Sequence, residues 1–345
     1  MSSGKGVCLG VVLWLIVISF LHATLNLGVF APHKSTTEAA FRVGFLPVTC
    51  HLTCPVTDFI NKQLSGESGF EPIRFQAWPE LKEAFISGYL PATFILAPLA
   101  MRMREDGVPI KIVYLGHRDG TAMVVHKESQ IYHIEDLRGK TIAVPNRFSN
   151  QKLLVIKAPK DHGVQPDEVK IVEMAPPDMP AALFSKSVDA ITSGEPYMGQ
   201  AELDGYGRVL YQTKDVWPNF ISCVLAVRED VIRDHRETVQ KLVDGIAKSG
   251  KWLDLTMDHR MKAADFVSQY YYNQNSRLLR FVLSKPPDRV KYTNLALRKN
   301  DFLEIEALAK ETGVLKGKVT FEDYADTSFV PPDKSIQPYA WDYQK

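Results

Sequence analysis

Three short stretches in the middle of the chain decide the fold: Glu173-Met-Ala-Pro-Pro-Asp-Met179, Val188-Asp-Ala-Ile-Thr-Ser-Gly-Glu-Pro-Tyr197 and Asp215-Val-Trp-Pro218. The first predicts a strand that runs into a Pro-Pro turn, with Asp178 placed to start a helix. The second predicts a short apolar strand that ends in small residues and Gly194, where backbone can approach a ligand closely. These stretches contain no nucleophile–base pair and no metal-ligand spacing. They therefore indicate a site that holds a molecule rather than one that converts it.

On both sides of these stretches, short apolar runs alternate with helical ones, a pattern typical of βαβ units in a largely parallel sheet. The earlier series has strands predicted at 41–46, 73–77, 93–96, 110–115 and 121–126, and helices at 55–64 and 80–87. The pattern restarts at 136–145, with strands at 169–172, 190–193 and 208–211 and helices at 151–160 and 179–187. Two α/β lobes are expected.

The apolar runs 121–126 and 220–227 are alike, and we expect them to pair as the two strands that cross between the lobes. The first lobe is predicted to comprise 41–125 plus 224–345, and the second 126–223. Helices at 237–254, 261–269 and 301–312 would pack on the first lobe. This is a hinged clam-shell, in which the carboxyl ends of the strands face a ligand cleft that closes by hinge motion.

The N-terminus differs in kind from the rest. Lys5 precedes a mostly apolar run from Val7 to about Phe30, the pattern of an export signal. Because more than about 18 apolar residues can also span a bilayer, two alternatives remain open: a signal cleaved near Ala31, or a retained membrane anchor in 1–31. Residues 32–40 would be a linker. In either case the rest of the chain is expected outside the cytoplasm.

Composition limits the partners. The net charge is +1 and the basic residues are scattered rather than clustered, so no nucleic-acid partner is expected. Four cysteines occur, and with Cys8 set aside Cys50, Cys54 and Cys223 remain. An odd number of cysteines in an oxidising compartment leaves at least one free thiol or metal ligand to explain.

Several motifs together carry a family resemblance. They are Trp78 after a strand, Phe94-Ile-Leu-Ala-Pro-Leu-Ala-Met101, Leu137-Arg-Gly-Lys-Thr-Ile-Ala-Val-Pro145, and the three stretches quoted at the outset. From about Phe41 to Asp254 the chain resembles the periplasmic substrate-binding proteins of nitrate/sulfonate/taurine/bicarbonate-type ABC transporters. The resemblance implies the type II two-lobe clam-shell fold, no catalysis, no cofactor, and delivery of a captured solute to a membrane permease and its ATPase.

The resemblance also implies candidate ligand contacts. Trp78 falls where the nitrate binder has a Trp against its ligand, and Gln151, with Asn150 beside it, lies near a family Gln that contacts the anion. Glu195, after Gly194, falls where the bicarbonate binder has a bound calcium nearby. Pro98 belongs to the same set of cleft positions. Each candidate also has a structural alternative: packing for Trp78, starting a helix for Asn150 and Gln151, and solvent contact for Glu195.

The departure from the family is Cys223, where the anion binders have a Lys. Without that cation an anion would depend on helix N-termini, His51 or Arg147 as donors. The segment Cys50-His51-Leu-Thr-Cys54 follows the first strand, where the first cleft loop is expected. Its cysteines can be small buried side chains. Alternatively, Cys50 or Cys54 joins Cys223 to bind a soft metal or a thiophilic ligand. The metal candidates are therefore Glu195 or these cysteines.

Three functions remain open at this point. The chain is a monomeric extracytoplasmic solute-binding component of an ABC uptake system, a membrane-tethered sensor or adaptor ectodomain, or an enzyme related to the thiamine-pyrimidine synthases that share the fold. The export signal and the lack of those enzymes' cysteine-rich signature argue against the third.

Overall fold

The fold is described from a computed structural model for residues 13–14, 17–19, 41–332 and 335–342. The chain forms two compact units, Met1–Ala40 and Phe41–Lys345, and the description below concerns the second. The predicted signal or anchor lies outside the described residues except for five positions between 13 and 19, and the linker at 32–40 lies wholly outside them. Within the described parts of the chain, no helix is long and apolar enough to cross a membrane.

Five strands form the first sheet, in the spatial order β2-β1-β3-β11-β4. Strands β1, β2 and β3 are parallel, whereas β11 lies antiparallel between β3 and β4. Every residue of β3 is buried, as expected for a strand covered on both faces. The bounds are β1 Arg42–Phe45, β2 Glu71–Arg74, β3 Ala92–Leu96, β4 Ile110–Leu115 and β11 Cys223–Arg228.

The second sheet repeats this arrangement in the order β8-β7-β9-β6-β10. Strands β7, β8 and β9 are parallel, and β6 lies antiparallel between β9 and β10. A short ladder between β5 (Arg118–Asp119) and β12 (Val290–Lys291) stands apart from both sheets. The bounds are β6 Thr121–His126, β7 Thr141–Val144, β8 Lys170–Glu173, β9 Ala190–Gly194 and β10 Gly207–Gln212.

The expected βαβ units are confirmed within each sheet, but two expectations about the strands are wrong. Within the two five-stranded sheets, half of the strand pairings are antiparallel, so these sheets are mixed rather than largely parallel. The runs 121–126 and 220–227 do not pair with each other, because β6 pairs with β9 and β10 while β11 pairs with β3 and β4. Both strands are apolar and buried, so their composition did not specify a sheet. Residues 121–125, assigned from the sequence to the first lobe, therefore contribute to the second sheet.

The helices between the strands begin and end at local signals. Helix α2 (Thr53–Ser65) ends at Gly66, which has a left-handed φ of 80° that glycine adopts without a Cβ penalty. Helix α5 (Asn150–Asp161) begins after Ser149, whose hydroxyl accepts the Lys152 N–H at 3.1 Å. The other bounds are α3 Trp78–Ile86, α4 Ala97–Glu105, α6 Met179–Phe184, α7 Tyr197–Leu203, α8 Thr213–Val216 and α9 Glu229–Asp234.

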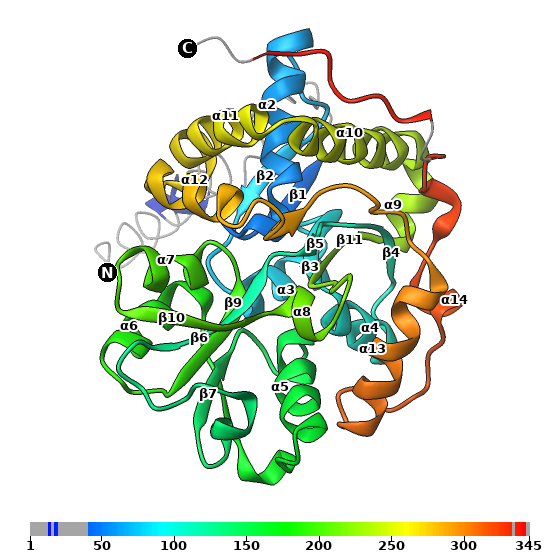
Figure 1. Cartoon of the computed structure of the whole chain (residues 1–345). Coiled ribbons are helices and arrows are strands. Elements are labelled where there is room, and N and C mark those ends of the chain that lie inside the picture. Colours follow the sequence, from blue (N-terminus) through cyan, green and yellow to red (C-terminus); the bar gives the residue numbers. More distant parts are fainter. Residues whose placement is uncertain (1–12, 15–16, 20–40, 333–334, 343–345) are drawn as a thin grey trace, which may run out of the picture. The chain divides into compact units, whose positions relative to one another are not determined.

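The C-terminal helices pack on the first lobe, as expected, and two of them also contact the second lobe. Helices α10 and α11 lie against α2, as Figure 1 shows, but α12 packs on α7 and α13 packs on both α4 and α5. One continuous apolar core accordingly includes residues from both sheets and from these helices. The bounds are α10 Arg236–Leu255, α11 Met257–Val267, α12 Ser276–Ser284, α13 Lys299–Glu311 and α14 Phe321–Tyr324.

Candidate functional site

The candidate site lies where the strands of the two sheets end. Cys50 and His51 belong to the 3-10 turn η1 (Thr49–His51) after β1, and Trp78 begins α3 after β2. From the second sheet, Gly194 ends β9 and Glu195 follows it. The lobes touch here directly, because the Thr49 N–H donates to the Glu195 carbonyl oxygen at 2.6 Å.

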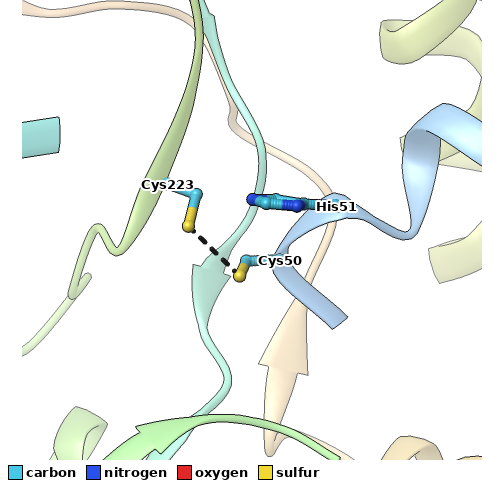
Figure 2. Close-up of side chains that lie close together, drawn as sticks. All are labelled: Cys50, His51 and Cys223. Atoms are coloured by element: carbon cyan, nitrogen blue, oxygen red, sulfur yellow. Dashed lines mark hydrogen bonds between the residues drawn. The ribbon is translucent and has the colours of Figure 1, made fainter. Parts of the chain in front are cut away.

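Two cysteines and a histidine form the densest group of the site. The Cys50 and Cys223 Sγ atoms are 3.2 Å apart and share an S–H···S hydrogen bond. Figure 2 shows these two side chains pointing at each other, with the His51 ring beside them. The two sulfurs and a ring nitrogen of His51 all lie within 4.8 Å of one another, and all three residues are buried. The first cleft loop and the start of β11 therefore meet, as one sequence alternative expected.

The hydrogen bonding of His51 fixes where its proton lies. The Leu46 N–H donates to His51 Nδ1 at 2.8 Å, so Nδ1 must be unprotonated and the neutral ring carries its hydrogen on Nε2. The ring packs edge-on to Trp78, with centroids 5.6 Å apart, and at 5.4 Å from Phe94. His51 therefore presents an N–H donor rather than a lone pair to its remaining neighbours.

The two thiols differ in acidity. Burial raises the pKa of Cys223, but the hydrogen bond from Cys50 and the interactions with His51 and Ser222 outweigh it and bring that pKa to about 6. Burial, reinforced by Cys223, instead raises the pKa of Cys50 well above its usual value. Cys223 is thus the thiolate of the pair and Cys50 the thiol.

The first turn of α5 brings amide side chains from the second lobe to the same place. Gln151 Nε2 donates to the Ser222 hydroxyl at 2.9 Å and to the Thr121 hydroxyl at 3.3 Å. Asn150 Nδ2 donates to the Ile221 carbonyl oxygen. Both amides are buried. Ser222 precedes Cys223, so this network connects α5 with the cysteine pair.

Glu195 is held by an ion pair rather than by solvent. Its carboxylate accepts from Arg289 Nη1 at 2.8 Å and from the Gly199 N–H at 2.7 Å, and both charged side chains are at most 1% exposed. Arg289 also bonds Glu202 of α7 at 2.7 Å. Desolvation raises the pKa of Glu195, although Arg289 opposes this effect. Glu195 is therefore committed to an internal contact.

Two other sequence candidates lie apart from the cysteine group. Cys54 is buried in the first turn of α2 and does not belong to the group of three. Pro98 is in the first turn of α4, where the Ala97 N–H donates to the Ser222 carbonyl oxygen at 3.0 Å. Pro98 is therefore near the Gln151 network, but it cannot donate a hydrogen bond because proline has no backbone N–H.

Sequence reasoning missed two charged or titratable residues here. Arg289 lies some 94 residues from Glu195 in the chain, and no local pattern connects them. His117 lies between β4 and β5. It is fully buried, and neither of its ring nitrogens has a hydrogen-bond partner among the described residues. Burial lowers the pKa of His117 to about 3, so this imidazole is neutral.

Two mixed α/β sheets that meet at a buried polar site define the two-lobe fold of the periplasmic binding proteins. The sequence profile of the NMT1-like family matches residues 34–268, and the chain belongs to that family. It is 25% identical over 268 residues to the nitrate/nitrite binding protein NrtA of a Nostoc species, covering 70% of this chain and 60% of that one. A zinc-bound ligand-binding component of an ABC-type import system from Staphylococcus aureus superposes with a TM-score of 0.76 at 25% identity, covering 87% and 99% of the two chains.

The chain spans only part of the curated relatives that it matches. It covers 37% of the nitrate import ATP-binding protein NrtC of a Synechocystis strain, at 23% identity over 67% of this chain. The fold also occurs in an enzyme: the desulfurization enzyme DSZB has a TM-score of 0.59 at 15% identity, with 84% of this chain covered and 97% of that one. The fold alone therefore does not exclude catalysis.

Proposed function

We propose that the protein is an extracytoplasmic solute-binding component of an ABC uptake system, which captures a small polar or anionic solute between its lobes. The observation that carries this proposal is the meeting of polar side chains from both lobes in a buried site. Cys50 and His51 come from the first lobe, and Asn150 and Gln151 from the second. Family membership and the import systems named for the relatives support the same assignment. In this proposal the second lobe is the stretch from β6 to α8, and a permease with its ATPase is the partner.

The ligand-binding role is assigned to groups with unused hydrogen-bonding capacity. Within the described part of the chain, Gln151 Oε1, Asn150 Oδ1 and the Trp78 indole N–H are buried without a partner. Buried polar atoms in proteins usually have hydrogen-bond partners. A solute that enters when the lobes open and bonds to these atoms would therefore remove the free-energy cost of burying them without partners. They include both donors and acceptors, and no lysine stands at position 223. This composition favours a neutral polar or hydrogen-bonding solute over a simple oxyanion.

The proposal holds that the solute is released unchanged and that the protein acts as a monomer. Recovery of the intact solute after prolonged incubation, measured by NMR, tests the first point.

The N-terminal apolar run favours a second candidate, a membrane-tethered sensor or adaptor ectodomain. N-terminal sequencing of the mature protein distinguishes them, because a chain that begins near residue 32 has been released.

A thermal-shift screen tests the binding function. Nitrate, bicarbonate, sulfonates, pyrimidines and divalent metals are added singly to the wild type and to Gln151→Ala. A ligand that binds only the folded form stabilises it by mass action and so raises the melting temperature. At a ligand concentration of 100 times Kd, the free energy of unfolding increases by about 2.7 kcal/mol. We expect one class to shift the wild type and to shift Gln151→Ala much less. Equal shifts in the two proteins would place the ligand elsewhere.

A further inference from the structure

The cysteine pair is placed for covalent chemistry between its own two sulfurs. The Sγ atoms are 3.2 Å apart, and a disulfide bond of about 2.05 Å requires each sulfur to move by only about 0.6 Å. Neither residue is bonded to another cysteine, and both are buried in the first lobe. Cys50 is carried by the turn η1 rather than by a strand, so its side chain can move without breaking a sheet.

A metal ion fits the same residues less well. A metal-bound histidine normally donates its second ring N–H to an acceptor. Here the second nitrogen, Nδ1, itself accepts the Leu46 N–H. Coordination through Nε2 would move the ring proton to Nδ1, where it would face that N–H. The neutral ring therefore supplies an Nε2–H donor, which stabilises a thiolate sulfur, and does not supply a ligand lone pair.

We propose that Cys50 and Cys223 form a reversible intramolecular disulfide, with His51 as the residue that positions and stabilises the reacting sulfur. Cys223 reacts first, because it is the thiolate of the pair. Cys54 takes no part. It lies outside the group of three, and burial with the neighbouring Asp58 raises the pKa of its thiol well above the usual value.

The oxidant is another disulfide, either a small one such as oxidised glutathione or that of an oxidoreductase. The Cys223 thiolate attacks one sulfur of that disulfide, forms a mixed disulfide and expels a thiolate. Cys50 then attacks the Cys223 sulfur, its proton passes to the departing external thiolate, and the second external thiol leaves. Two protein thiols and one external disulfide become one protein disulfide and two external thiols.

The second lobe controls access to this reaction. A Cβ on Gly194 of β9 would stand 3.4 Å from Cys50 Sγ, so β9 lies directly against the sulfur. Because both cysteines are buried when the lobes are in contact, an external disulfide reaches them only after the lobes separate. A solute that favours closure should therefore slow oxidation.

The test uses the full chain equilibrated in glutathione buffers from fully reducing to fully oxidising. The samples are quenched in acid, unfolded, alkylated and mapped by mass spectrometry. Of the four cysteines in the sequence, we expect all four to be alkylated in the reduced protein and two fewer after oxidation. A peptide containing Cys50 should be linked to one containing Cys223. This test needs no transported solute, so its result is independent of the proposed function.

Four variants accompany the wild type. Cys54→Ser should still form the link, whereas Cys50→Ser and Cys223→Ser should each abolish it. His51→Leu should lower the alkylation rate of Cys223 at pH 7 by about tenfold or more, because the thiolate fraction falls when its N–H donor is lost. A structural loss alone would expose the sulfur and speed the reaction.

Three results would overturn the proposal. The first is a disulfide between Cys50 and Cys54 in place of the expected one. The second is complete alkylation of all cysteines at every glutathione ratio. The third is that added zinc protects reduced Cys50 and Cys223 from alkylation and blocks their oxidation. The last would make the group a metal site.

Discussion

The buried ion pair between Arg289 and Glu195 gives the sharpest stability prediction. Arg289→Met keeps most of the side-chain volume and removes the charge, which leaves the Glu195 carboxylate buried with only the Gly199 N–H as a partner. Removing one member of a buried pair costs about 3–5 kcal/mol. Because the Gly199 bond survives and Glu202 is partly exposed to water, we expect the lower end, about 3 kcal/mol, in urea unfolding at pH 8.

The pH dependence of that loss separates electrostatics from packing. The pKa of Glu195 is raised in the folded protein, so its protonated form is favoured there, and stability falls as the pH rises from about 4.5 through the folded pKa. Without Arg289 the pKa of Glu195 rises further and the fall is larger. The difference in unfolding free energy between the wild type and Arg289→Met should therefore be smaller at pH 5 than at pH 8.

Two controls complete the experiment. The double variant Glu195→Gln/Arg289→Met, which no longer buries a charge at this point, should regain at least half of the lost stability. Lys299→Met breaks an exposed ion pair with Glu322 and should change stability by less than about 0.5 kcal/mol. A loss below 1 kcal/mol in Arg289→Met, or the same loss at both pH values, would refute the reasoning.

Three further outcomes follow from other contacts. Gly250→Ala should cost about 1–3 kcal/mol in denaturant unfolding, because its Cβ would stand 2.1 Å from the Tyr292 carbonyl oxygen; an unchanged midpoint would contradict that close approach. Gln151→Leu should cost about 1–3 kcal/mol, because the buried Ser222 hydroxyl loses its amide donor, and Ser222→Ala in the same background should then cost little more. Burial depresses the pKa of His117 to about 3 from 6.5, so the unfolded chain binds the extra proton and stability falls as the pH drops below 6.5. His117→Leu should flatten the pH profile of unfolding between pH 6.5 and 4, and an unaltered slope would mean that His117 is charged in the folded protein.

Local patterns predicted most of the secondary structure. Strand β3 and helix α5 arise from apolar runs and capping residues that act within a few positions, which is why their limits could be predicted from the sequence. The placement of β11 could not, because its neighbours β3 and β4 lie more than a hundred residues earlier. Its apolar composition is compatible with any buried strand position, and its place between β3 and β4 is decided only by the tertiary pairing of the strands.

The candidate site was predictable to a similar degree. Cys50 and Cys223 could be suspected from their places after the first strand and at the start of the run leading into β11. The tautomer of His51 could not be predicted, because it depends on a hydrogen bond from the Leu46 backbone N–H. The residue types alone do not show that this contact forms. Glu195 was expected at the cleft edge, and its partner Arg289 lies in a segment after α12 whose position depends on tertiary packing.

The insertion of β11 also sets an order for biosynthesis. The five strands of the second sheet lie in one continuous stretch, 121–212, whereas the first sheet lacks its fourth strand until residues 223–228 have been made. Domains generally fold as units while the chain is synthesised. The later-encoded sheet can therefore form first on the ribosome, and the sheet at the start of the chain has to wait with β3 and β4 unjoined. A truncated chain that ends at residue 222 and has been released from the ribosome should protect the second sheet from protease and leave β1 to β4 open to cleavage.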